Sequence, residues 1–292
     1  MQDTSERFQV IVDSVPTTAW QYGAPDGQPL IFVHGFRGDH HGLEGLAESI
    51  TAQAPELRVI VPDLPGFGES EAAPGKVHDL DFYGEWLRGF VAALGLADGG
   101  YAILGHSFGS LIVANSLSQG LTPTNVTLIN PIASPALEGP QALMTGLAVG
   151  YYRVAERLPE PASRTLLGHP LIVRAMSEFM AKTRDKHLRA WIHDQHDRYF
   201  SNFADSNTLL QAFRASVSHT VGEYAHSITA PTLLIVGDRD DITPLSAQLV
   251  LSHRLADATL RVMPGVGHLV HYEAVEPAVA EMLTFLRARQ TR

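Results

Sequence analysis

Residues Tyr101 to Asn115 read YAILGHSFGSLIVAN, and this stretch decides the fold. Four residues dominated by apolar side chains lead into Gly105, as in a short buried strand, and a helix-forming run follows Gly109. Glycine stands two residues before and two residues after Ser107, where side chains would clash in a tight strand-to-helix turn. The pattern therefore predicts a serine held on a sharp turn between a buried strand and a helix, a position typical of a nucleophile.

Short apolar runs alternate with helical patterns on both sides of this turn. A hairpin is predicted over FQVIVDSV (8–15) and TTAWQY (17–22). The other expected strands are PLIFVHG (29–35), LRVIVPD (57–63), YAILGHS (101–107), VTLINP (126–131), APTLLIVGD (230–238) and TLRVMPG (259–265). Alternation of strands and helices with buried strands predicts an α/β fold, in which helices flank a mainly parallel central sheet.

The alternation stops in the middle of the chain. Residues 134–227 contain helical patterns and no convincing strand, and they carry apolar and aromatic side chains that need burial. An inserted helical cap explains this block better than a linker. The predicted organisation is a sheet domain of residues 1–133 and 228–292 with a cap of residues 134–227.

Composition excludes several classes of protein. The 292 residues are 45% hydrophobic and 18% charged, which is typical of a globular chain and argues against disorder. A net charge of −10 argues against nucleic acid as a partner, and the lack of cysteine excludes disulfides and thiolate chemistry. No apolar run approaches the ~18 residues of a membrane span, and MQDTSERFQV lacks a signal peptide's apolar core. We therefore expect a cytoplasmic protein, while the sequence does not distinguish a monomer from a homodimer.

Four further motifs accompany Gly105–Gly109 in a fixed order. His34–Phe36 (HGF) and Asp63–Ser70 (DLPGFGES) each follow an expected strand. Gly237–Pro244 (GDRDDITP) and Gly265–His268 (GVGH) follow the last two. With these motifs in this order, the sequence resembles the α/β-hydrolase fold family over nearly its whole length. Ser110 departs from the family pattern, in which a second glycine often follows the turn.

The resemblance implies a catalytic triad of Ser107, Asp240 and His268, in the chain order that this fold uses. Histidine takes the proton of the serine hydroxyl, and the acid orients the imidazole. The backbone N–H groups of Phe36 and Phe108 are expected to form the oxyanion hole. This chemistry requires neither a metal nor an organic cofactor.

Two assignments have neighbouring alternatives. Asp238 and Asp241 flank the expected acid, and the Gly-x-x-Asp-x-x-x-Pro spacing favours Asp240. His271 also lies beyond the last strand, but the glycines that precede His268 are missing before it.

The remaining candidates concern the pocket and metal binding. Met176, Met180 and Trp191 of the inserted block are candidates for the substrate pocket. Two clusters contain ligand-type side chains: Asp39-His40-His41, and His193 with His196 and Asp197. We interpret both clusters as polar surface and predict no metal site.

The expected activity is hydrolysis of a small to medium carboxylic ester through an acyl-enzyme. The serine in the turn argues against dehalogenases and epoxide hydrolases, which use a carboxylate there. Rivals on the same triad are a carbon–carbon bond hydrolase, a lyase, a thioesterase and a cofactor-free perhydrolase. A ligand receptor with slow turnover is a rival from another class, and burst kinetics would separate it from an enzyme.

Overall fold

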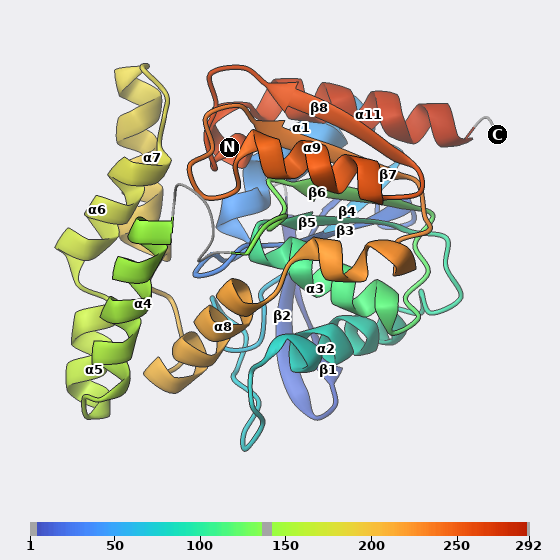
Figure 1. The fold of residues 1–292 in the computed structure, drawn as a ribbon. Helices are drawn as coiled ribbons and strands as arrows, with labels where there is room; N and C mark the ends of the chain where they lie inside the picture. The colour runs from blue at the N-terminus through green and yellow to red at the C-terminus, as the bar shows by residue number, and fades with distance from the viewer. Residues whose placement is uncertain (1–4, 136–141, 291–292) are drawn as a thin grey trace.

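The computed structural model describes residues 5–135 and 142–290. An eight-stranded sheet with the order β1-β2-β4-β3-β5-β6-β7-β8 forms its centre (Figure 1). The strands are β1 (Ser5–Val12), β2 (Val15–Gly23), β3 (Gln28–Val33), β4 (Leu57–Pro62), β5 (Ala102–His106), β6 (Asn125–Ile129), β7 (Thr232–Gly237) and β8 (Ala258–Met263). Strand β2 runs antiparallel to β1 and β4, and all other pairs are parallel. The predicted α/β fold class is confirmed.

Helices cover both faces of the sheet. The helical elements are α1 (His41–Gln53), α2 (Leu80–Ala93), α3 (Phe108–Ser118), α4 (Ala142–Glu156), α5 (Glu160–Leu167), α6 (Pro170–Met180), α7 (Lys186–Tyr199), α8 (Ser206–Ser218), η1 (Val221–Ser227), α9 (Leu245–Arg254), α10 (Val270–Glu273) and α11 (Val275–Gln290). One apolar core packs α1 and α11 against the sheet, and a second packs α2, α3 and η1 against the other face. Strands β5, β6 and β7 are consequently buried along their whole length, as their continuous apolar sequences predict.

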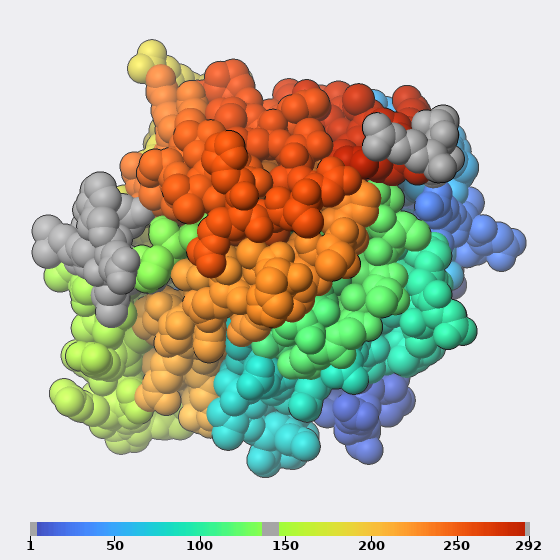
Figure 2. Space-filling view, turned by 45° about the vertical axis from the view of Figure 1, so that its right-hand side comes forward, coloured from blue at the N-terminus to red at the C-terminus, as the bar shows by residue number. Residues whose placement is uncertain are grey.

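Helices α4 to α8 are inserted between β6 and β7, and α4 to α7 stand to one side of the sheet in Figure 1. After this insertion the chain returns to the sheet domain. Figure 2 shows the light-orange segment of α8 and η1 packed directly against the green and teal helices of the first half. Strands β7 and β8 then complete the sheet, which is therefore built from segments on both sides of the insertion. Residues 136–141, which begin the expected cap, lie outside the described residues.

The sequence has a helical pattern throughout residues 169–200, but the structure divides this stretch into α6 and α7. The backbone N–H groups of Lys182 and Thr183 donate to Oε1 of Glu273, at 2.6 and 3.2 Å. Asp185 then caps α7 by accepting from the N–H groups of His187 and Leu188. The break therefore ties the insertion to α10, two residues beyond the GVGH motif.

Candidate active site

Ser107 lies at the turn between β5 and α3 with φ 52° and ψ −116°, a conformation that side chains rarely adopt. A Cβ atom on Gly105 would lie 2.6 Å from the carbonyl oxygen of Gly109, and a Cβ on Gly109 would collide with the carbonyl oxygen of Val33. Both glycines are thus required by close backbone approach. The Ser107 N–H donates to the carbonyl of Ile129 at 3.0 Å, which holds the turn on the sheet.

The structure brings the three predicted triad side chains together. Nε2 of His268 lies 2.8 Å from Oγ of Ser107, and Nδ1 of His268 lies 2.8 Å from Oδ2 of Asp240. Because a carboxylate only accepts, Nδ1 carries the proton and Nε2 is free to accept the serine proton. This arrangement is the relay that a serine nucleophile requires.

Asp240 is buried and fully hydrogen-bonded. Its Oδ1 accepts from the N–H groups of Ile242 and Thr243, and its Oδ2 accepts from Oγ1 of Thr243 at 2.5 Å. Burial alone would raise the pKa of Asp240, but the neighbouring His268 and these hydrogen bonds outweigh it and hold the pKa below its usual value. The carboxylate therefore remains ionised near neutral pH.

The two alternative acids and the alternative base occupy other positions. Asp238 accepts from the N–H of Gly265, and Asp241 is an exposed carboxylate paired with Lys182 at 2.6 Å. His271 is buried beside His106, and burial lowers its pKa well below the usual value.

Two further histidines hold the loops next to the Ser107 turn by hydrogen bonds, and their rings are neutral. His106 donates from Nε2 to the carbonyl of His268, and burial, followed by the proximity of His268, lowers its pKa to about 3. His34 donates from Nδ1 to the carbonyl of Gly35 and accepts from the N–H of Leu64. Burial also lowers the pKa of His34. Both rings therefore fix loops next to the serine without carrying charge.

The amides of Phe36 and Phe108, which are predicted to form the oxyanion hole, belong to segments next to Ser107. A Cβ on Gly35 would lie 3.2 Å from Cβ of Ser107, so the loop that carries Phe36 abuts the serine. Phe108 is the first residue of α3, where backbone N–H groups have no helical partner. Among the described residues, neither N–H finds an acceptor. Both are thus free to bind a developing negative charge.

Asn130 was not singled out from the sequence, yet it connects the two loops that carry Asp240 and His268. Its side chain donates to the carbonyl of Gly267 at 3.0 Å and accepts from the N–H of Gly237 at 2.9 Å. Its φ of 43° is of the kind that asparagine tolerates better than most residues. The sequence signal that could have identified Asn130 was an asparagine directly after the apolar run VTLI (126–129).

The triad opens into a cavity of about 430 Å³, within the size range of small-molecule sites. Ser107, His268, Phe36 and Phe108 line it from the sheet domain. The inserted helices contribute mainly apolar side chains, among them Tyr152, Met176, Phe179, Met180, Phe200 and Phe213. The cavity thus combines one polar reactive edge with a mostly apolar wall.

The structure places Met176 and Met180 on the cavity wall, but it does not place Trp191 there. Trp191 is 44% exposed, and its ring packs edge-on against Tyr272 with centroids 5.2 Å apart. Tyr272 itself lines the cavity, so Trp191 lies behind that wall. The expectation for Trp191 was wrong because helical periodicity does not specify which face of α7 turns inward.

Arg37 joins the loop of Phe36 to the inserted helices. This buried guanidinium donates to the carbonyls of Phe200 and Leu167, to the hydroxyl of Tyr152 and to Oγ of Ser201. The hydrogen bonds reach α4, the end of α5 and the segment after α7. Arg37 was not singled out from the sequence, because its acceptors lie more than a hundred residues away.

We expect Arg37→Met to lower the free energy of unfolding by about 2–4 kcal/mol, because it leaves several buried acceptors without donors. Urea unfolding measures this change. Arg198→Met is the matched control, since Arg198 is exposed and forms a surface pair with Asp194. Equal stabilities of the two variants would contradict the anchoring role of Arg37.

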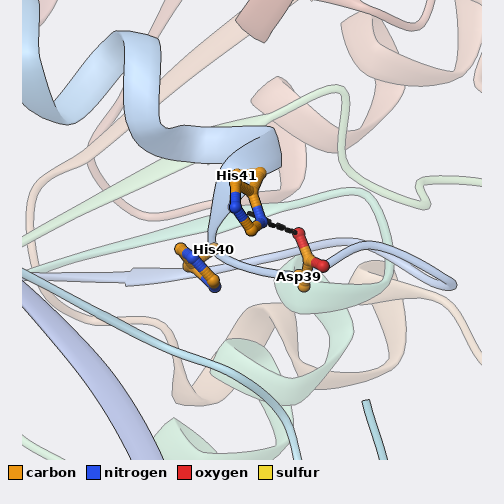
Figure 3. Close-up of side chains that lie close together, drawn as sticks. All are labelled: Asp39, His40 and His41. Carbon is orange, nitrogen blue, oxygen red and sulfur yellow. Dashed lines mark hydrogen bonds and ion pairs between the residues drawn. The ribbon is translucent and has the colours of Figure 1, made fainter. Parts of the chain in front are cut away.

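The first candidate metal cluster is held together by hydrogen bonds. In the described part of the chain, Asp39, His40 and His41 are the group whose ligand atoms all lie within 4.8 Å of one another (Figure 3). Nδ1 of His41 donates to Asp39, and Nδ1 of His40 donates to Asp63. The two rings are tilted by 36° to each other, with centroids 3.9 Å apart. In the second cluster, Asp197 pairs with Arg174 at 3.6 Å.

The hydrolase class of fold is defined by a parallel α/β sheet, a serine in a strand-to-helix turn and a histidine that faces this serine. The family model for the alpha/beta hydrolase fold matches residues 28–275. The chain belongs to the α/β-hydrolase fold family. Within the described residues, no helix combines the length and the apolar character needed to cross a membrane.

Relatives within this family carry different names. The chain is 32% identical over 275 residues to the dihydrolipoyllysine-residue acetyltransferase component of the acetoin cleaving system of Pseudomonas putida. This match covers 92% of the chain but 66% of that relative, just under two thirds of its length. The chain is 25% identical to the non-heme chloroperoxidase of Burkholderia pyrrocinia, with 94% and 98% covered. A solved esterase from Thermogutta terrifontis is similar in fold, with a TM-score of 0.77, 22% identity and 97% and 99% coverage.

Proposed function

We propose that this protein hydrolyses small to medium carboxylic esters through an acyl-enzyme on Ser107. The observation that carries the proposal is the continuous relay at the edge of the cavity, with 2.8 Å from Ser107 to His268 and 2.8 Å from His268 to Asp240. Ester cleavage needs a nucleophile, a base, an oxyanion site and a pocket. Side chains or amides of the cavity supply a candidate for each.

In the proposed reaction, Oγ of Ser107 attacks the ester carbonyl carbon while its proton passes to Nε2 of His268. Asp240 stabilises the resulting imidazolium, and the amides of Phe36 and Phe108 stabilise the oxyanion. The imidazolium protonates the leaving alkoxide, which departs as the alcohol. Water, deprotonated by the same imidazole, then attacks the acyl-enzyme and releases the acid.

The experiment is a panel of 4-nitrophenyl esters of increasing acyl length. A burst of nitrophenolate followed by steady turnover is expected if an acyl-enzyme forms. Turnover slower than about one event per hour with tight binding would favour the receptor alternative. Because one relative is named a chloroperoxidase, a parallel arm adds hydrogen peroxide and halide to test the perhydrolase alternative.

We expect chelation to leave ester turnover unchanged, because the proposed relay uses only side chains and backbone amides. Initial rates before and after dialysis against EDTA test this expectation. A loss that zinc or manganese restores would contradict it and would direct attention to His40 and His41.

We further propose that residues 134–227 act as a cap over a sheet domain of residues 1–133 and 228–292. The cap would set substrate range, because its helices supply the apolar wall of the cavity while Ser107 and His268 come from the sheet domain.

Met176→Trp and Met180→Trp are expected to shift the preferred acyl chain toward shorter acids, because the larger ring fills the cavity. The effect should be small for acetyl esters and about tenfold or more for the longest accepted chain. Ratios of kcat/KM along the ester panel measure it, with Leu171→Trp, at an exposed position of α6, as the control. A uniform loss over all esters would contradict the cap role.

A further inference from the structure

A chain of buried polar groups crosses the inserted helices beneath the cavity. Helices α6 and α7 lie side by side (Figure 1). Oγ of Ser177 on α6 lies 2.6 Å from Nδ1 of His193 and 2.7 Å from Nδ1 of His196, both on α7. All three side chains are buried. A serine hydroxyl has one proton, so it donates to one of these rings and accepts from the other.

Glu178 decides the direction of these hydrogen bonds. Its Oε1 lies 3.1 Å from Nε2 of His193. The two atoms do not form a hydrogen bond in this structure, but a ring lone pair on Nε2 would be repelled by the carboxylate. The proton of His193 is therefore placed on Nε2, which leaves a lone pair on Nδ1. Ser177 donates to that lone pair and accepts from Nδ1–H of His196. Nε2 of His196 is thereby left with a lone pair.

This nitrogen belongs to a ring on the cavity wall. His196 lines the same cavity as Ser107 and is 4% exposed. Its hydrogen bond in the described part of the chain runs from Nδ1 to Ser177. The buried ring nitrogen of this group that has no hydrogen-bond partner is Nε2 of His193, not Nε2 of His196. Burial, followed by the proximity of His193, lowers the pKa of His196 to about 4, and burial also lowers the pKa of His193. Both rings are therefore neutral at pH 7, as the described proton arrangement requires.

We propose that His196 determines specificity by accepting a hydrogen bond from a hydroxyl or amide N–H group of the substrate. The proposal rests on the proposed ester hydrolysis and adds the class of ester: one that carries a hydrogen-bond donor reaching the cap. A buried acceptor without a donor is costly, so an apolar group at this place is disfavoured. Ser177, His193 and Glu178 are positioning residues that act through His196.

Substrate preference tests the role of His196. The 4-nitrophenyl esters of 2-, 3- and 4-hydroxybutanoate are compared with the matching methoxy esters, which can accept but not donate. For the unmodified protein and for His196→Leu, kcat/KM of each hydroxy ester is divided by kcat/KM of the matching methoxy ester. The ratio of the unmodified protein is then divided by the ratio of the variant, which cancels the steric difference between the two groups. We expect this quotient to reach about tenfold or more for at least one position. A quotient near one at all positions overturns the proposal.

A second variant guards against a folding defect in His196→Leu. His196→Gln keeps an amide oxygen that can accept, so it should retain much of the preference and affect KM more than kcat. Loss of the preference in the glutamine variant, with its melting temperature unchanged, would count against acceptance of a hydrogen bond by the side chain.

Glu178→Gln tests the positioning chain. A glutamine amide can donate to Nε2 of His193, which permits the opposite proton arrangement and turns Nε2 of His196 into a donor. The preference should then move about fivefold or more toward methoxy esters. Asp194→Asn is the matched control, because it removes a carboxylate of α7 that pairs with Arg198 and leaves Ser177 untouched. Equal preferences in the two variants would overturn the role of Glu178.

A measurement without turnover separates this inference from the proposed function. Long-range ¹H–¹⁵N spectra report the protonated nitrogen of each neutral histidine, and His196→Gln and His193→Gln assign the signals. We expect Nδ1–H for His196 and Nε2–H for His193, with His196 Nε2 shifting on titration with hydroxybutanoates but not butanoate. Nε2–H on His196, or equal shifts with both acids, overturns the inference even if esters are hydrolysed. If the spectra are as expected but no ester is hydrolysed, only the proposed function is overturned.

Discussion

Replacing Ser107 by alanine is expected to lower kcat for 4-nitrophenyl esters by about 10⁴-fold or more, because no other group could form the acyl-enzyme. Nε2 of His268 lies within hydrogen-bond distance of this serine, and the turn holds the hydroxyl at the cavity. Rapid-mixing measurements should show the loss of both the burst and the steady-state rate. Retention of more than a tenth of the activity would refute the assignment of the nucleophile.

Two further variants make the result specific. Ser118→Ala removes an exposed hydroxyl from the same helix and should leave kcat unchanged. Ser107→Gly should be as inactive as Ser107→Ala but should melt at a higher temperature. A positive φ strains a residue with a Cβ by roughly 1–3 kcal/mol, which exceeds the roughly 0.5–1 kcal/mol that glycine adds to the flexibility of the unfolded chain.

Asp240→Asn is expected to lower kcat by about 10⁴-fold while leaving the fold intact. An asparagine amide can donate to Nδ1 of His268, which moves the imidazole proton to Nε2. An imidazole in that form cannot accept the proton of Ser107. Steady-state kinetics together with the melting temperature distinguish this chemical effect from unfolding.

The two neighbouring aspartates provide matched controls. Asp241→Asn removes a carboxylate whose surface pair with Lys182 contributes at most about 1 kcal/mol, so activity should stay within a few fold. Asp238→Asn keeps an amide oxygen that can accept from the Gly265 N–H, so it should have a small effect. If either control lost activity while Asp240→Asn kept it, the acid would have to be reassigned.

The strands, the serine turn and the positions of the triad candidates could be predicted because each depends on neighbouring residues. Apolar runs such as YAIL and TLLIV specify buried strands, and glycines at positions 105 and 109 permit the close backbone approach that the turn requires. In a parallel sheet the strand ends meet at one edge. Motifs that follow β5, β7 and β8 are therefore brought together.

The arrangement of the inserted helices could not be predicted in the same detail. Met176 and Met180 line the cavity while Trp191 lies behind Tyr272, although all three belong to amphipathic helical patterns. Periodicity shows that a helix has an apolar face, but the direction of that face depends on which other helix or loop packs against it. The break between α6 and α7 depends likewise on Glu273, about ninety residues away.

The local order of the chain determined the α/β architecture and the serine turn, and the resemblance to the α/β-hydrolase fold family supplied the candidates for acid and base. Only the tertiary structure decided which residues that lie far apart in the chain form hydrogen bonds with one another. Arg37 reaches acceptors in the inserted helices, and Ser177 joins His193 to His196. The physical reason is that a hydrogen bond needs its donor and acceptor within about 3 Å, and only packing of the folded chain brings such distant residues that close.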